Sequence, residues 1–153
     1  MVGRRALSRR ELGDRLRDKG FPAGPVAAEV ERLHAAGLLD ELELARAVCR
    51  ARLRQGKGRR AIETELWRRH IDPQAGAQAV AELVGDEVTG ALEAAMDRAV
   101  RRSPQWRQLP RERAKVVRYL LTRGFDAAEV RRVLGREPDE ENDAVTTFDS
   151  SDP

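Results

Sequence analysis

The sequence is poor in cysteine, aromatic residues and long apolar runs, and each shortage excludes a class of protein. The single cysteine, Cys49, cannot form an internal disulfide, which fits a reducing compartment and a cytoplasmic location. No apolar run approaches the roughly 20 residues that a bilayer-spanning helix needs, and the opening residues lack the apolar stretch of a signal peptide. Two separate histidines and one cysteine do not have the spacing of a zinc site. We therefore expect no metal, no cofactor and no membrane association.

Catalytic motifs are missing as well, so we expect a protein that is not an enzyme. The sequence has no Ser–His–acid or Cys–His grouping, and no HExxH, CxxC or GxSxG motif. Gly56-Lys57-Gly58 resembles part of a phosphate-binding loop, but the full spacing and the preceding strand are lacking. We interpret it as a tight loop between helices that leaves Lys57 free to contact a phosphate. Cys49 is expected to be a core residue, with a reactive thiol as the alternative.

Arginine, by contrast, is abundant, and the charge is unevenly distributed. The formal net charge is +3. Residues 137–153 contain seven acids and no base, so residues 1–136 carry 29 bases against 19 acids, and only three of the bases are lysine. An excess of positive charge over residues 1–136 favours a polyanionic partner. Arginine suits bidentate contact with phosphates or carboxylates. The acidic tail is predicted to be disordered. It either only aids solubility or competes with a partner for the basic surface.

Helix formers dominate the body, and apolar residues recur at a spacing of three to four. Caps, prolines and glycines place eight helices at about 9–20, 25–36, 41–55, 59–70, 73–84, 87–103, 110–123 and 126–135. A capping box formed by Ser8 and Glu11 is expected to start the first of them. No segment has the sustained alternation of a strand, so the predicted fold class is all-α.

An internal repeat organises these helices. Positions 12, 16 and 21 recur 50 residues later and again after a further 54, as the triplets Leu12–Leu16–Phe21, Ile62–Leu66–Ile71 and Val116–Leu120–Phe125. This predicts an elongated, curved array of three-helix units that resemble the helix-turn-helix motif. The expected parts are a truncated first unit at 1–38, a second at 39–86, a third at 87–136 and the tail at 137–153.

Three residues invite both a structural and a functional interpretation. His70 occupies the turn position that Gly20 and Gly124 fill in the other units, so it is expected at positive φ, or else as a pH switch or ligand. Trp67 is expected to pack between units, or to be a binding hot spot. Trp106 is expected to anchor its loop, or to be a stacking platform.

The bases gather in two clusters, at 46–69 and 98–123, whereas residues 1–45 have as many acids as bases. Arg46, Arg50 and Arg54 share one helix face. Either these clusters are merely a solvated surface, or they bind nucleic acid or an acidic protein without reading sequence. The candidate contact residues are Arg46, Arg50, Arg52, Arg54, Lys57, Arg59, Arg60, Arg68, Arg69, Arg98, Arg101, Arg102, Arg113, Lys115, Arg118 and Arg123.

The stretch 37–72, GLLDELELARAVCRARLRQGKGRRAIETELWRRHID, resembles the core signature of the RecX family. The matching positions include Gly37-Leu38-Leu39-Asp40, Ala45, Arg52, Gly56, Gly58, Ile62, Glu65-Leu66 and Ile71. KVVRYLLTRGF at 115–125 is similar to the third repeat of the family. Three positions depart from the pattern: Glu41 replaces a second aspartate, Leu44 a phenylalanine and His70 a glycine.

The resemblance implies a non-enzymatic regulator of RecA, and because nothing in the sequence demands a dimer, we expect a monomer. It would bind RecA or its filament, contact single-stranded DNA weakly, and suppress ATPase, strand exchange and co-protease activities in DNA recombination, repair and the SOS response. Two alternatives stay open on the residues alone. One is a helix-turn-helix-like DNA-binding module, and the other is a helical scaffold for an acidic protein.

Overall fold

Residues 6–83 and 85–135 are described by a computed structural model, and within them the chain is helical, with no strand. Eight helices lie in this part of the chain, close to the predicted positions. They are α1 (Arg9–Asp18), α2 (Ala23–Ala35), α3 (Glu41–Arg54), α4 (Arg59–Arg68), α5 (Pro73–Ala81), α6 (Gly85–Arg102), α7 (Pro110–Thr122) and α8 (Ala127–Gly135). The prediction for the tail at 137–153 falls outside the described residues.

Local capping explains where the helices begin and how the turns close. Ser8 accepts a hydrogen bond from the Glu11 amide while the Glu11 side chain bonds back to Ser8, which is the predicted capping box. Asp40 and Asp72 cap α3 and α5 with their side chains, which accept hydrogen bonds from the amides of Glu43 and Ala75. His70 has a φ of 51°, which confirms that it occupies the turn position that usually requires glycine.

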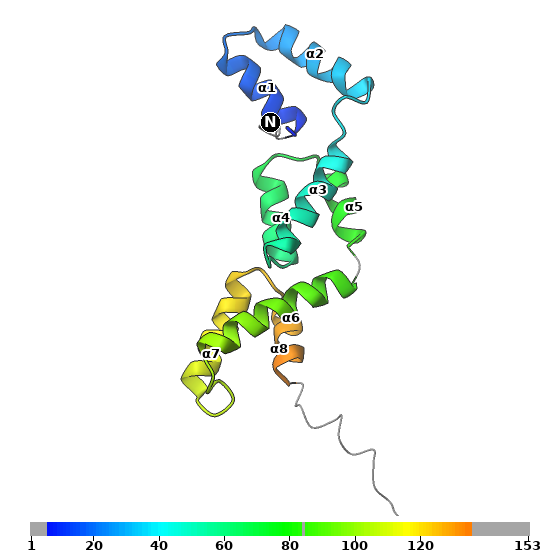
Figure 1. The fold of residues 1–153 in the computed structure, drawn as a ribbon. Helices are drawn as coiled ribbons and strands as arrows, with labels where there is room; N and C mark the ends of the chain where they lie inside the picture. Colours follow the sequence, from blue (N-terminus) through cyan, green and yellow to red (C-terminus); the bar gives the residue numbers. More distant parts are fainter. Residues whose placement is uncertain (1–5, 84, 136–153) are drawn as a thin grey trace, which may run out of the picture.

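The helices form three groups stacked along one axis, so the molecule is elongated (Figure 1). α1 packs on α2, α3 packs on α4 and α5, and α6 packs on α7, which contacts α8. The boundaries drawn at residues 38 and 86 remain predictions. In the described residues the first group has only two helices, and no residue of α1 is fully buried. The stacking on neighbours is what repeat proteins rely on for stability.

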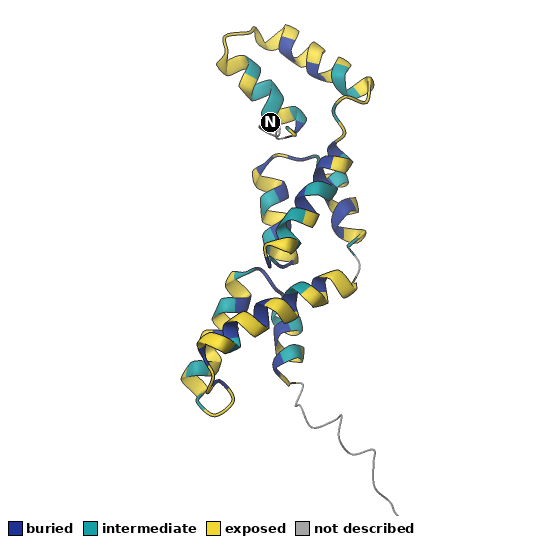
Figure 2. Cartoon of the chain, viewed as in Figure 1, coloured by how far each residue is buried: buried dark blue, intermediate teal, exposed yellow. Residues whose placement is uncertain are grey.

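Each of the other two groups has its own apolar core, visible as dark stripes along the facing helices (Figure 2). Ile62 and Leu66 of α4 lie at the centre of one core, and Val116 and Leu120 of α7 at the centre of the other. Cys49 is 1% exposed in the first core and Trp106 is 3% exposed in the second. Both are therefore structural residues, as predicted. None of the helices in the described residues is long and apolar enough to cross a membrane.

Candidate nucleic-acid interface

The junction between the second and third groups brings a basic loop against a basic helix. The amide of Gly58 donates to the carbonyl of Arg123 at 2.8 Å, and the amide of Arg60 donates to the carbonyl of Gly124 at 3.1 Å. A Cβ on Gly58 would lie 2.5 Å from the Gly124 carbonyl, so only glycine permits this approach. The contact fixes the loop at 56–58 beside the third group.

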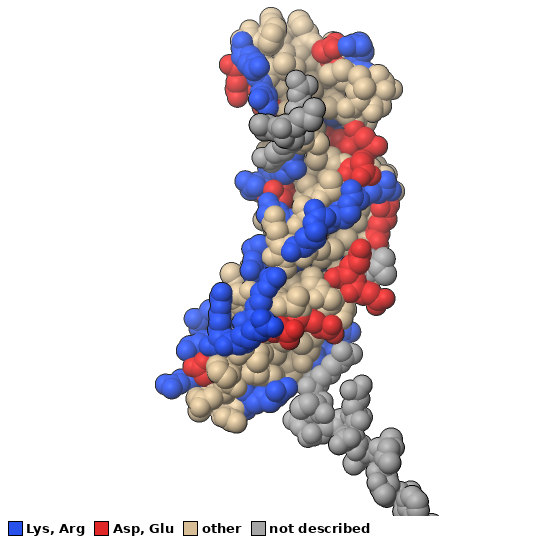
Figure 3. All heavy atoms as spheres, viewed as in Figure 1, with Lys and Arg blue, Asp and Glu red and all other residues tan. Residues whose placement is uncertain are grey.

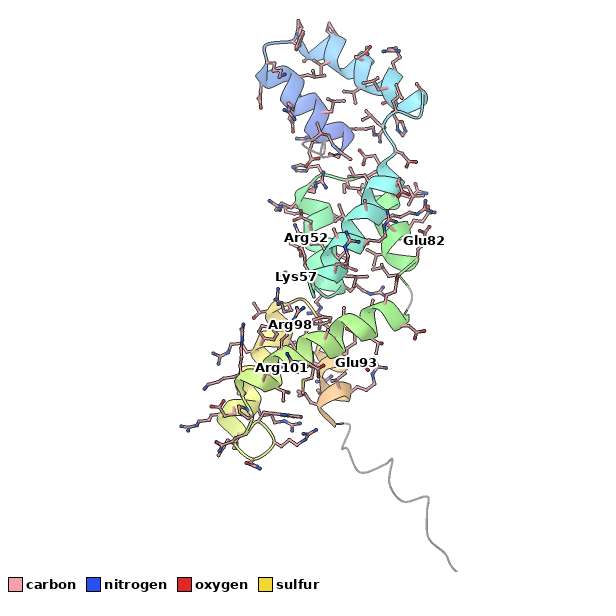
Figure 4. All side chains as sticks on the ribbon, viewed as in Figure 1. Arg52, Lys57, Glu82, Glu93, Arg98 and Arg101 are labelled. Carbon is pink, nitrogen blue, oxygen red and sulfur yellow. The ribbon has the colours of Figure 1, made fainter. Side chains whose placement is uncertain are left out.

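Three cations line up across this junction. Gly56 has a φ of +69°, and a Cβ built on it would lie 3.1 Å from an Arg98 guanidinium nitrogen. Arg98 therefore lies against the loop that carries Lys57. Figure 4 shows Lys57, Arg98 and Arg101 following one another from the end of α3 along α6. We call these three residues the junction strip.

The junction strip has an acidic neighbour on α6, because Asp97 lies one helical turn before Arg101, but the two form no ion pair. No carboxylate of the described residues forms an ion pair with Lys57, Arg98 or Arg101. In Figure 3 basic side chains run across the second group and onto the third, and acidic side chains lie along the right-hand edge and, on the third group, beside the basic band. Six further candidates also have no ion pair within the described ranges: Arg54, Arg59, Arg102, Arg113, Arg118 and Arg123. Cations of this kind are available to an external anion.

The predicted stripe on α3 is largely compensated within the protein. Arg46 holds Glu82 of α5 through two hydrogen bonds of 2.7 and 2.9 Å. These bonds lower the pKa of Glu82 to about 2. Arg50 pairs with Glu43 at 2.8 Å. Of the three arginines that share this face, only Arg54 is without an ion pair in the described residues.

Other candidates also have internal partners. Arg52 and Arg68 both pair with Glu65 at 2.8 Å. Partial burial raises the pKa of Glu65, but hydrogen bonds from the two arginines outweigh it and the net shift is downward. Arg60 pairs with Asp126 at 3.0 Å, and Lys115 with Glu112 at 2.8 Å. The arginine and lysine partners other than Arg52 are exposed, so these cations can also turn to another anion.

Arg69 is the exception, because it is buried. Its side chain is 8% exposed, pairs with Glu11 at 2.9 Å and donates to the carbonyl of Ala6 at 2.7 Å. Its own carbonyl accepts a hydrogen bond from the Ser8 hydroxyl at 2.9 Å. We therefore assign Arg69 to the interface between the first two groups and leave it out of the proposed contact surface.

Glu41 completes this interface, and sequence reasoning treated it only as a substitute for aspartate. Its carboxylate is 7% exposed and accepts hydrogen bonds from the amides of Arg9 at 2.6 Å and Asp72 at 2.5 Å. The two donors come from different groups, so one side chain holds them together. No sequence pattern marks this role of Glu41, because its hydrogen-bond donors are backbone amides, which every residue type carries.

Aromatic rings hold some of the remaining arginines. Arg107 and Arg113 lie 4.5 and 5.9 Å from the centroid of the Trp106 ring, and Arg123 lies 5.4 Å from that of Tyr119. Such cation–π contacts position a guanidinium without neutralising it. Trp67 does not pack between units as expected: it is 78% exposed, so that prediction was wrong.

No group of three or more His, Cys, Asp and Glu side chains in the described residues could hold a metal ion. The arrangement offers positive charge, backbone rigidity at the junction and one exposed tryptophan. Chemically, this equips the surface for binding an anion or a protein.

Comparison with known proteins identifies two segments. Residues 40–80 match the family model of the second three-helix domain of RecX, and residues 89–134 match that of the third. The matched ranges enclose most of α3–α5 and of α6–α8. They agree with the repeat units inferred from the spacing of apolar residues.

Whole proteins from several bacteria are similar over most of their length. A regulatory protein RecX from Chromohalobacter salexigens is 32% identical, over 88% of this chain and 86% of its own. One from Acidithiobacillus ferrooxidans is 34% identical, over 88% and 84%. One from Halorhodospira halophila is 35% identical, over 86% and 80%.

Proposed function

The chain belongs to the RecX family of regulatory proteins, and on that premise we propose that it regulates RecA in the cytoplasm. It binds RecA and the filament that RecA forms on single-stranded DNA. By doing so it lowers the ATPase, strand-exchange and co-protease activities of RecA. It acts by binding, as a monomer and without catalysis of its own.

The junction strip carries this proposal. Lys57, Arg98 and Arg101 have no ion pair in the described residues, so a phosphate can be bound there without breaking an internal salt bridge. Contacts of this kind release counterions from the nucleic acid, and they are salt-dependent and independent of sequence. A regulator that must act anywhere along a filament needs this lack of sequence preference.

The elongated stack supports a mechanism for the inhibition. Three groups of helices in a row (Figure 1) present a long surface, and on this proposal that surface contacts more than one repeating subunit of the filament. A rigid ligand that bridges neighbouring subunits opposes any change in their relative position. The movements that accompany ATP turnover and filament growth are slowed in this way.

The direct test follows ATP hydrolysis by RecA on single-stranded DNA while the purified protein is added. We expect hydrolysis to fall, and to fall less with the Lys57→Gln, Arg98→Gln, Arg101→Gln triple variant. The matched control is Arg46→Gln, Arg50→Gln, which removes cations that are already compensated, and it is expected to inhibit nearly as well as the unaltered protein. Circular dichroism checks that each variant is folded.

Two results would contradict the proposal. One is unchanged hydrolysis at a several-fold excess of the folded protein over RecA. The other is tight, sequence-selective binding to duplex DNA with no affinity for RecA, which would favour a helix-turn-helix-like module instead.

A further inference from the structure

Trp67 is the most exposed of the large apolar side chains in the described residues. It is 78% exposed, compared with 56% for Phe21 and 43% for Leu121. It lies one residue after Leu66, which points into the core of the second group. An exposed tryptophan leaves a large apolar area in water, and tryptophan is enriched at the energetic centres of protein interfaces.

A groove of about 490 Å³ lies beside Trp67, between α4 and α5. Its walls are apolar, with Leu66, Ile71, Pro73, Ala77 and Val80 among them. Gly76 of α5 forms part of the lining, and a Cβ there would lie 3.6 Å from a Leu66 methyl group. Because position 76 lacks a side chain, the groove stays open. Glycine inside a helix costs about 1 kcal/mol relative to alanine, so the open groove has an energetic cost.

Trp67 also borders a second hollow, of about 370 Å³, at the interface with the first group. His70, Arg9 and Arg10 line that side. The indole is therefore a ridge between two depressions. A partner can contact it on both sides, which is the arrangement of a central anchor residue.

The charges around the groove indicate what kind of partner fits. Neighbouring arginines are internally compensated, since Arg68 pairs with Glu65 and Arg69 with Glu11. None of the three residues of the junction strip lines the groove. Phosphates gain little from such a site. Two carboxylates, Glu63 and Asp72, and one cation, Arg59, line the groove, so its charge favours a basic group next to an apolar group.

We propose that Trp67 and the groove beside it dock RecA protein itself, through a large apolar side chain that has a basic neighbour. The proposal rests on the proposed function and divides it between two surfaces. The junction strip contacts the phosphates of DNA, and the Trp67 groove contacts a RecA subunit. The groove's volume is in the range of pockets that accept apolar side chains or ligands.

The test measures two affinities separately: that for RecA without DNA, and that for single-stranded DNA without RecA. Trp67→Ala is expected to weaken RecA binding at least about tenfold and to change DNA binding less than about twofold. Gly76→Leu, which fills the groove, is expected to act in the same direction. Glu63→Gln is expected to weaken RecA binding about threefold, as for a rim charge.

Phe21→Ala is the matched control, because it removes an exposed aromatic side chain from a residue that does not line the groove. It is expected to leave both affinities unchanged. Since Trp67 is exposed, its removal should not alter the helical content, and circular dichroism checks this. Trp67→Ala therefore tests the groove even if Gly76→Leu fails to fold.

The outcomes separate the two proposals. If the unaltered protein does not bind RecA, the proposed function fails, and the groove assignment fails with it. If it binds RecA and Trp67→Ala binds equally well, only the groove assignment is overturned. Loss of DNA affinity with RecA affinity retained would make Trp67 a stacking platform for bases and would also overturn it.

Discussion

The amide of Gly58 donates a 2.8 Å hydrogen bond to the carbonyl of Arg123, and this contact repeats one unit earlier in the chain. There the hydroxyl of Ser8 donates to the carbonyl of Arg69 at 2.9 Å. Ser8 precedes Gly58 by 50 residues and Arg69 precedes Arg123 by 54, which are the offsets of the sequence repeat. The units therefore stack in one register twice. Serine bridges the first interface with its side chain, whereas glycine brings the backbone itself into contact in the second.

Gly124→Ala should disrupt the second of these interfaces. Gly124 has a φ of +89°, and a Cβ would lie 2.5 Å from Cβ of Ala61. Gly20 has a φ of +91° but nothing within 4 Å, so Gly20→Ala isolates the backbone strain. We expect Gly20→Ala to lower the free energy of unfolding by about 1 kcal/mol, and Gly124→Ala to lower it by about 1–3 kcal/mol more. Urea denaturation measures both, and equal losses would refute a tight junction.

Arg69→Met should loosen the first interface. It removes an ion pair with Glu11 and a hydrogen bond to Ala6 at a site where the arginine is 8% exposed. We expect a loss of about 2–4 kcal/mol in the free energy of unfolding. Arg68→Met is the control, because Arg68 is 65% exposed and its pair with Glu65 should contribute less than about 1 kcal/mol. A similar effect of both changes would contradict the buried role of Arg69.

The junction strip should be detectable in the salt dependence of DNA binding. For single strands, each phosphate contact contributes about 0.7 to the slope of log K against log salt. Arg101→Gln or Lys57→Gln should each reduce the slope by roughly that amount. Arg46→Gln should reduce it less, because Arg46 is held by Glu82. Fluorescence anisotropy of a labelled oligonucleotide at several salt concentrations tests this, and identical slopes for all variants would argue against the strip.

The pair formed by Arg46 and Glu82 should give the stability a defined dependence on pH. Hydrogen bonds from Arg46 and Gln78 lower the pKa of Glu82 from 4.5 to about 2 in the folded protein. The unfolded chain therefore binds more protons at this residue between those values, and the contribution of the pair is fully present above pH 4.5 and is lost as the pH falls toward 2.

Glu82→Gln removes this contribution, so its deficit in melting temperature should be largest near neutral pH and should shrink below pH 4.5. Both side chains are exposed, so the deficit should be small. Glu63→Gln, at a carboxylate without an ion pair in the described residues, is the control. A deficit for Glu82→Gln that stays constant from pH 7 to 2 would contradict the assigned pKa.

Cys49 should react slowly with thiol reagents in the folded protein. Its side chain is 1% exposed, and burial raises the pKa of the thiol. Since the reactive species is an accessible thiolate, modification at pH 8 should be at least about 100-fold slower than in denaturant, because it must wait for local opening. Absorbance of a disulfide reagent follows the reaction. Comparable rates in the two conditions would show that Cys49 is not a core residue.

Much of the fold follows from short-range features of the sequence. The capping box at Ser8 and Glu11, the positive φ of His70 and the eight helices of the described residues were all predicted, because caps, turns and amphipathic periods act within a few residues. The repeat offsets also predicted successive units, since each unit buries its own apolar positions. The burial of Cys49 and Trp106 followed from the same patterns.

The sequence by itself therefore determined an all-helical repeat protein with an excess of arginine, and only the tertiary structure decided which arginines are available. Arg46 meets Glu82 and Arg69 meets Glu11 across 36 and 58 residues. A count of charges cannot reveal such pairs, because Coulomb interactions depend on distance in space and not on separation along the chain. The exposure of Trp67 likewise depends on the tertiary structure, because it was decided by how α4 and α5 pack. An apolar side chain is buried only where a neighbouring element covers it.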